Sequence, residues 1–249
     1  MENRISIVTI TLDDDPWLIA DNVGSVRGQA TSFDIEHILV EGGSRKHNDT
    51  LRHIDSSLKI YNQAPAGIYS AINYGLCRTS GGIIGLVHGS DRLASDDVAE
   101  TVGRCFSDHP EVDFIYGDIV YARKVSAEGP RELVRRYSGS RFRPDLLKYG
   151  VQPPHPSLFI RRSAMDKIGL YNEKFVICGD FDYWLRLFSP GAGLCWKYLP
   201  KVMVEMSPGG ISSKWSNRLR VSFPEKLRAL RENGICSNPL MLLWRVFYL

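Results

Sequence analysis

Short apolar runs alternate with amphipathic segments over the first 110 residues of the chain. The runs are rich in β-branched residues, as buried strands are, and the segments between them repeat apolar side chains at helical spacing. Strands that alternate with helices in this way form βαβ units around a largely parallel sheet. The pattern predicts strands at residues 5–10, 35–40, 58–61 and 83–87, and helices that begin at Pro16 or cover residues 49–56, 67–77 and 95–106.

The pattern loosens after residue 110. Residues 112–121 predict a strand or a hairpin, and residues 123–143 form a charged segment. Ser222-Phe223-Pro224-Glu225 matches a capping box, in which a serine and a glutamate bond the first turn of their own helix. No repeat or low-complexity linker divides the chain, which favours a single α/β domain. Further strands are expected at residues 158–161 and 197–204, and further helices at residues 163–169, 180–188 and 223–234.

The composition is that of an ordinary globular protein, since 43% of the 249 residues are hydrophobic and 24% are charged. Lys and Arg number 31 against 28 acidic residues, a balance that does not indicate a nucleic-acid partner. The five cysteines are scattered and form no CxxC pair, which argues against a disulfide framework and suits a reducing cytosol. We find no signal-peptide pattern and no apolar run near the roughly 20 residues of a membrane span, so we expect a cytoplasmic protein.

Polar residues follow the predicted strands at residues 9–13, 41–44 and 88–91. Ligands of open α/β sheets bind at the carboxyl ends of the strands, and glycines there let the backbone approach a ligand. A tight turn at residues 41–44 and a helix-capping role for Asp91 are the alternatives. No P-loop or GxGxxG motif accompanies these segments, which argues against a kinase or a dehydrogenase. The candidate residues are Thr9, Thr11, Glu41, Gly43, Ser44, His88, Ser90 and Asp91.

A fourth segment, residues 67–75, places Tyr69 and Asn73 on one helix face. With this segment the chain resembles family 2 glycosyltransferases of the GT-A fold, in particular bacterial polysaccharide and colanic-acid-type enzymes. Those enzymes carry D-G-G-S, then G-I-Y-D-A-M-N-x-G, then G-D-I-I-G-F-L-N-S-D-D. The resemblance spans roughly residues 4–235. Its motifs lie at residues 41–44, 67–75, 82–91, 155–159, 179–187 and 209–212.

The resemblance implies a GT-A fold with a mostly parallel sheet, a nucleotide-binding half at about 1–110, an acceptor half at about 111–235 and an apolar tail at 236–249. It implies inverting transfer of a hexosyl or N-acetylhexosaminyl group from a UDP- or GDP-linked sugar. The acceptor would be a glycan or lipid-linked glycan of bacterial surface polysaccharide synthesis. The residues expected to hold the nucleotide sugar are Thr9, Thr11, Glu41, Gly43, Ser44, Tyr69, Asn73, Ser90 and Asp91.

The same resemblance assigns the chemistry. Asp91, with His88, would hold Mg²⁺ or Mn²⁺ on the diphosphate, and Asp180 would be the base that deprotonates the acceptor, unless it only caps its helix. Asp182 lies two residues on, some 200° around a helix, and cannot share that role. His155 would lie on the acceptor side, with a purely structural role as the alternative.

Several departures from the family pattern bear on activity. Glu41 replaces the usual Asp, Leu12 stands where relatives have a Tyr that stacks on the base, and Ile72 stands where many have an Arg. Residues 88–91 keep only one of the two carboxylates of N-S-D-D. The alternative is therefore a nucleotide-sugar-binding protein with little or no activity. A nucleotidyltransferase would need a Gly-rich phosphate loop with Lys or Arg after the first strand, and residues 9–15 have none.

Two further features leave their roles open. Five arginines within 13 residues would suit a phosphate-bearing acceptor lipid, or form a solvated basic loop. The apolar tail and its basic neighbours would form a peripheral membrane contact, or a core or dimer contact. The five arginines are Arg131, Arg135, Arg136, Arg141 and Arg143.

Overall fold

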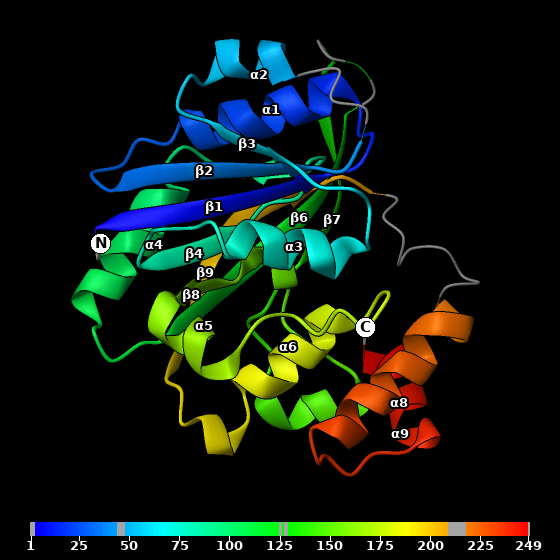
Figure 1. The fold of residues 1–249 in the computed structure, drawn as a ribbon. Helices are drawn as coiled ribbons and strands as arrows, with labels where there is room; N and C mark the ends of the chain where they lie inside the picture. Colours follow the sequence, from blue (N-terminus) through cyan, green and yellow to red (C-terminus); the bar gives the residue numbers. More distant parts are fainter. Residues whose placement is uncertain (1–2, 44–47, 125, 127–128, 209–217, 249) are drawn as a thin grey trace.

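The first half of the protein is a regular parallel sheet with helices on both faces (Figure 1). The structure is a computed structural model that describes residues 3–43, 48–124, 126, 129–208 and 218–248. Strands β3, β2, β1 and β4 lie side by side in that order, and all three pairings are parallel. The elements are β1 (Arg4–Thr11), α1 (Pro16–Arg27), β2 (Asp34–Glu41), α2 (Asn48–Ile54), β3 (Lys59–Asn62), α3 (Ile68–Leu76), β4 (Ile83–Leu86), β5 (Arg92–Leu93) and α4 (Val98–Asp108).

The second half extends the same sheet as a mixed one. Strand β8 runs antiparallel to both β4 and β6, so β6 runs in the same direction as β4, and β9 runs parallel to β6. The charged segment at residues 123–143 contributes a strand, β7, which forms a hairpin with β6. The elements are β6 (Phe114–Lys124), β7 (Arg131–Tyr137), η1 (Pro144–Tyr149), η2 (His155–Ser157), β8 (Phe159–Arg161), α5 (Arg162–Ile168), α6 (Gly179–Leu187), η3 (Pro190–Ala192), β9 (Trp196–Met206), η5 (Arg218–Ser222), α8 (Phe223–Glu232) and α9 (Pro239–Tyr248).

Alternation along the central strands supplies both faces of the sheet with apolar side chains. Ile38 and Val40 of β2 pack with α3 and α6, whereas Leu39 packs with α1 and α2. Ile5 and Ile7 of β1 pack with α4. Figure 1 shows α1 and α2 above the sheet, α3 in front of it, and α8 and α9 beside α6. The parallel strands β1, β2 and β3 end side by side at Thr11, Glu41 and Asn62, and the polar motifs begin at this edge of the sheet.

Two local predictions need correction, and both concern the N-terminus of a helix. Helix α4 begins at Val98 and not at residue 95, and Asp97 occupies its N-cap position. The Ser95 hydroxyl donates to the Asp97 carboxylate (2.6 Å) and does not cap the helix. Ser222 makes no capping bond with α8, and Glu225 reaches a different segment.

The apolar tail is helix α9, which buries Leu242 against the protein. None of the helices in the described part of the chain is both long and apolar enough to cross a membrane.

Candidate functional site

The polar segments of the first half meet at one edge of the sheet. Thr11 at the end of β1 lies beside Glu41 at the end of β2, and Glu41 lies beside Asn62 at the end of β3. The N–H of Gly42 donates to the Thr11 carbonyl (2.9 Å), and the N–H of Gly89 donates to the Ile10 carbonyl (2.9 Å). Backbone hydrogen bonds therefore join the segments that the sequence placed at three separate strand ends.

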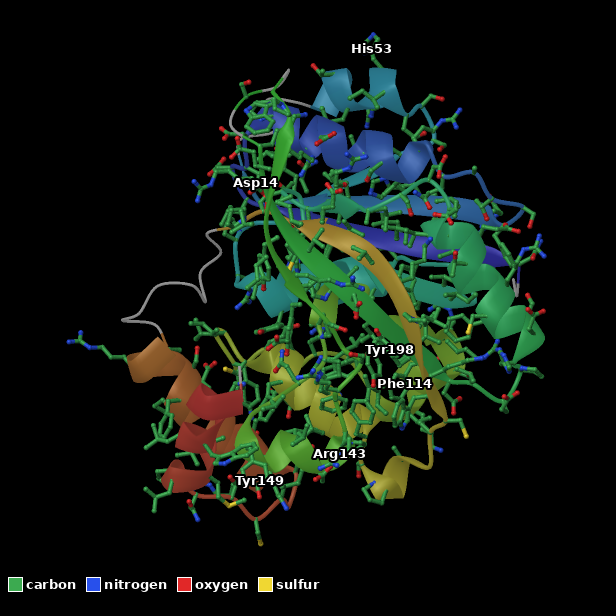
Figure 2. The ribbon with its side chains drawn as sticks, turned by 180° about the vertical axis from the view of Figure 1, so that it is seen from behind. Asp14, His53, Phe114, Arg143, Tyr149 and Tyr198 are labelled. Atoms are coloured by element: carbon green, nitrogen blue, oxygen red, sulfur yellow. The ribbon has the colours of Figure 1, made fainter. Side chains whose placement is uncertain are left out.

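Glycines let these segments touch. A Cβ on Gly43 would lie 2.4 Å from Asp13 Oδ1, and a Cβ on Gly89 would lie 2.8 Å from Asp14 Oδ2. Asp13 itself has a left-handed φ of 52°. The Thr11 hydroxyl donates to Asp14 Oδ2 (2.8 Å), and burial raises the pKa of Asp14. Asp14, labelled in Figure 2, was not among the predicted site residues, although the sequence shows acids at 13–15.

Asp91 is buried beside this loop, with only 3% of its surface exposed. Its Oδ1 accepts the N–H of Ser207 (2.9 Å), and the Ser207 hydroxyl donates to the Ser90 carbonyl (2.6 Å). Burial raises the pKa of Asp91 to about 7; the Ser207 N–H opposes this shift and the charge of Asp14 adds to it. A buried carboxyl next to a second one is an unfavourable place for negative charge, which a bound cation would relieve.

His88, His155 and Asp180 form a second group, drawn from the loop after β4, from η2 and from the first turn of α6. Burial lowers the pKa of His88 to about 4, with His155 lowering it further and Asp180 raising it. Burial also lowers the pKa of His155, against the charge of Asp180. His155 Nε2 lies 2.9 Å from the Tyr171 hydroxyl. Both imidazoles are therefore neutral near pH 7, and the structure brings together three residues predicted on separate motifs.

Tyr69 and Asn73 share a helix face as expected, but their polar atoms join the two halves of the chain. The Tyr69 hydroxyl donates to the Ile177 carbonyl and accepts the N–H of Asp180 (3.3 Å). Asn73 Nδ2 donates to the Tyr171 carbonyl (2.9 Å), and Asn73 Oδ1 accepts the Tyr171 N–H (2.9 Å). These contacts differ from the predicted donor-binding role, because both side chains are used inside the protein.

The segment of residues 176–178, here called the base turn because it precedes the predicted base Asp180, is held from helix α8. The carboxylate of Glu225 accepts the backbone N–H groups of Val176 (2.6 Å), Ile177 (2.9 Å) and Cys178 (2.8 Å). The sequence assigned Glu225 to the cap of its own helix. The structure shows that it caps the turn that precedes α6 instead, across the second half of the protein.

Asp180 follows the base turn and is half-buried. Its Oδ2 accepts Gln152 Nε2 (2.6 Å), and its Oδ1 accepts the N–H of Phe181 (2.7 Å). Cys178 occupies the N-cap position of α6, so Asp180 is not the cap. Asp182 points elsewhere, into an ion pair with Arg186 (3.0 Å), as the helical geometry predicted. No sequence signal pointed to Gln152.

The remaining predicted residues are placed as follows. Side-chain alternation turns Thr9 to the face covered by α1, where it is fully buried and bonds Asn22 (3.1 Å) and His37 (2.9 Å). Thr9 is therefore not exposed at the strand ends, in contrast to the prediction. Glu41 is buried at the edge. Ser44 and the motif at residues 209–212 lie outside the described residues.

The five arginines do not form one patch. Arg131 pairs with Asp21 of α1, whereas Arg136 pairs with the buried Asp118 of β6 (2.5 Å). The described residues include no group of three or more His, Cys, Asp or Glu side chains placed to hold a metal. Asp91 therefore fits only an ion that takes most of its ligands from a diphosphate and water, as Mg²⁺ commonly does.

Curated proteins similar to this chain are named as glycosyltransferases. The chain is 28% identical over 189 residues to a PGL/p-HBAD biosynthesis glycosyltransferase of Mycobacterium bovis, covering 74% of this chain and 70% of the relative. It is 27% identical over 190 residues to an uncharacterized glycosyltransferase of Mycobacterium tuberculosis, covering 73% and 68%. No family model matches the chain.

Solved structures with the same fold are glycosyltransferases of the GT-A type. S. aureus TarS 1-349 in complex with UDP has a TM-score of 0.65 at 14% identity, covering 99% of this chain and 72% of that one. The mannosyltransferase PcManGT of Pyrobaculum calidifontis, with GDP-Man and Mn²⁺, has a TM-score of 0.62 at 15% identity, covering 90% and 64%. This chain spans 39% of a longer TarS chain. The predicted α/β GT-A fold is confirmed.

Proposed function

We propose that this protein is a glycosyltransferase that moves a hexosyl or N-acetylhexosaminyl group from a nucleotide diphosphate sugar to a hydroxyl acceptor. The observation that carries the proposal is the geometry of Asp180, whose carboxylate is held by Gln152 and by the Phe181 N–H next to two neutral histidines. The names of the curated relatives support the reaction class. Structures of the same fold with UDP, UDP-GlcNAc or GDP-Man support the donor class.

In the proposed reaction Asp180 accepts the proton of the acceptor hydroxyl. The acceptor oxygen forms a bond to the anomeric carbon, and the bond from that carbon to the phosphate oxygen breaks. The nucleoside diphosphate leaves with the electron pair of that bond, and attack from the opposite face inverts the anomeric centre. A positioned base of this kind contributes about 10²–10⁴-fold to the rate.

The donor is proposed to bind at the strand ends. Thr11, Glu41, Gly43, Ser90 and Asp91 meet there, and Ser44 follows in the sequence. We assign Mg²⁺ or Mn²⁺ to the carboxylate of Asp91; the imidazole of His88, predicted as a second ligand, lies instead with His155 and Asp180. The ion would supply Lewis-acid stabilisation of the leaving diphosphate. Thr9, Tyr69 and Asn73 instead build the support beneath the site.

The acceptor is proposed to be a glycan, lipid-linked, in bacterial surface polysaccharide synthesis, reached from the cytoplasmic face of a membrane. Helix α9 supports this, because Leu240, Leu243 and Trp244 are exposed on it. The Trp244 ring lies 4.9 Å from that of Tyr149, which is labelled with Arg143 at one end of the molecule in Figure 2. Binding to anionic vesicles that weakens with salt is the expected behaviour.

A binding protein without transferase activity is the second candidate, because residues 88–91 carry a single carboxylate. One experiment separates the two. UDP-GlcNAc and GDP-mannose are titrated with and without Mn²⁺ by thermal shift, where a ligand at 100 times its Kd adds about 2.7 kcal/mol. Release of UDP or GDP is then followed with water or a glycan as acceptor. Donor binding with product release supports the enzyme; binding without release supports the binding protein.

A further inference from the structure

Gln152 lies in a short segment whose backbone is held on both sides. Its carbonyl accepts the hydroxyl of Tyr137 at 2.5 Å. Two residues earlier, Gly150 has a left-handed φ of 76°, and its carbonyl accepts Lys226 Nζ at 2.6 Å. Two prolines follow Gln152 directly and restrict the backbone there. The backbone position from which the Gln152 side chain extends is therefore fixed.

The side-chain amide of Gln152 faces Asp180. Its Nε2 donates to Asp180 Oδ2 at 2.6 Å, while Asp180 Oδ1 accepts the N–H of Phe181 at 2.7 Å. Turning the amide by 180° would set its oxygen against the carboxylate, so the carboxylate determines the orientation of the amide. Both carboxylate oxygens are then held, and each keeps a lone pair that is free of hydrogen bonds from the described residues.

This orientation has a cost within the protein. Gln152 Oε1 is buried and has no hydrogen-bond partner among the residues that the structure describes. An unpaired buried acceptor loses its hydration without compensation, whereas an apolar side chain of similar size would avoid that loss. The amide therefore contributes less to stability than a fully paired amide would. What distinguishes it from an apolar residue is the N–H that it directs at Asp180.

We infer that Gln152 is a positioning residue for the acceptor-side base: its amide holds Asp180 Oδ2 toward the acceptor hydroxyl. The inference rests on the proposed function. A base displaced by as little as 1 Å can lose about 10²-fold in rate, so the orientation of the carboxylate acts on turnover. It does not act on the nucleotide, which binds at the strand ends.

The test uses Gln152→Leu in the full chain, with UDP-GlcNAc or GDP-mannose as the donor. We expect kcat to fall about ten- to a hundredfold, with the donor Kd within twofold of wild type. The loss should appear in kcat, with the KM of the donor as unchanged as its Kd. The melting temperature should change little, because loss of the bond to the half-buried Asp180 is offset by removal of the unpaired Oε1. Lower turnover without lower stability is not the result of a merely structural residue.

Gln29→Leu is the matched control. Gln29 Nε2 donates to the carbonyls of Ser25 (3.0 Å) and Ser95 (2.8 Å), and its Oε1 accepts the Ala99 N–H (2.8 Å). Every polar atom of this amide is paired, so its loss should lower the melting temperature and leave kcat unchanged.

The outcomes separate the inference from the function on which it rests. If the wild type transfers sugar and Gln152→Leu matches its kcat, the inference is overturned and the function stands. If the leucine variant does not fold, Gln152→Glu keeps the size and sets a second carboxylate against Asp180, which displaces it. The kcat of this variant should then fall with the donor Kd unchanged, and an unchanged kcat overturns the inference. If the wild type binds donor but releases no product, both the function and the inference are overturned.

Discussion

The two halves of the protein position their polar groups by different means. In the first half β1 pairs with β2 over eight residues without a register shift, and backbone hydrogen bonds bring the strand-end loops together. In the second half β6 pairs with three strands, and its register shifts near Asp118 and again at Tyr121. There the side chains of Gln152 and Glu225 hold the acidic residue and its turn. The backbone places the donor end, and side chains from distant segments place the acceptor end.

Aromatic rings provide the rigidity that the second half lacks in its sheet. The Tyr171 ring is stacked between those of Tyr183, 4.0 Å away, and Tyr69, 5.9 Å away. The rings of Phe114 and Tyr116 meet the Trp184 ring of α6, and Figure 2 shows Phe114 next to Tyr198 in the same region. Since the stack runs from α3 to α6, it fixes the base turn relative to the donor half.

The largest expected effect belongs to Asp180→Asn. Asparagine keeps the size and the bond to Phe181, so the fold should survive, but it cannot accept the acceptor proton. Turnover should fall by about 10²–10⁴-fold while donor affinity stays within a few-fold, since the base contacts only the acceptor. Initial rates of UDP or GDP release and donor titration on both proteins check this.

Asp182→Asn is the control for that variant. Asp182 is buried in an ion pair with Arg186 and accepts a hydrogen bond from Asn233, so the substitution should lower the melting temperature and spare turnover. If the Asp180 variant turns over like the wild type and the Asp182 variant does not, the base has been assigned to the wrong carboxylate.

The next effect is on stability, through Glu225→Ala. The substitution removes the acceptor of three backbone N–H groups in the base turn, of which that of Val176 is exposed and the other two are part-buried; hydrogen bonds to a charged group contribute about 1.5–3 kcal/mol each where water is excluded. We expect the free energy of unfolding to fall by about 2–3 kcal/mol and turnover to fall with it, because Asp180 lies two residues after the turn. Urea denaturation measures the first and product release the second.

Glu232→Ala on the same helix is the matched comparison. Glu232 forms only an exposed i,i+4 pair with Arg228, and such pairs contribute about 0.3–0.5 kcal/mol. Equal losses of stability in the two variants would mean that the base turn does not depend on helix α8.

The contrast between the halves also explains how far the sequence could predict them. The strands and helices of the first half were predicted because their apolar periodicity and their backbone pairing are local. The position of Thr11 and Glu41 at the strand ends followed from the same pattern. Gln152 was missed, because its contact with Asp180 joins residues 28 apart along the chain and leaves no periodic mark. Thr9 was misplaced because it lies two residues before the end of β1, where the strand is still covered by α1.

Glu225 shows the same limit in a stronger form. The residues at 222–225 fit a capping box, and the local rule assigned the carboxylate to its own helix. In the folded protein the three N–H groups of residues 176–178 are also without helical partners, and they take the carboxylate. A local motif predicts that the carboxylate will accept backbone N–H groups at a helix or turn. It does not predict which of two competing sets of N–H groups the carboxylate will cap.

A smaller effect is expected at the donor end, from Asp91→Asn. Asparagine can still accept the Ser207 N–H but has no charge for a metal ion. The Mn²⁺-dependent part of UDP or GDP binding should therefore weaken by about ten- to a hundredfold, the range seen when ligand-supporting groups are lost. Calorimetric titration with and without Mn²⁺ measures it. Asp97→Asn, at an exposed pair with Lys201, should leave this binding unchanged. If Mn²⁺ does not alter binding to the wild type, the metal assignment is wrong.

The smallest effect concerns His37, which lies under the donor end and bonds Thr9 at 2.9 Å. Burial lowers the pKa of His37 to about 4, from an ordinary value of 6.5. The folded state therefore binds the proton less well than the unfolded state. The stability that follows is complete above pH 6.5 and is lost as the pH falls toward 4. His88 acts in the same direction, whereas Asp91, with its raised pKa, acts in the opposite one over the same range.

His37→Gln should thus lower the slope of unfolding free energy against pH by up to about 1.4 kcal/mol per pH unit between pH 4 and 6.5. Urea denaturation at half-unit steps of pH measures this slope, and parallel curves for the two proteins would show that His37 is not buried in its neutral form.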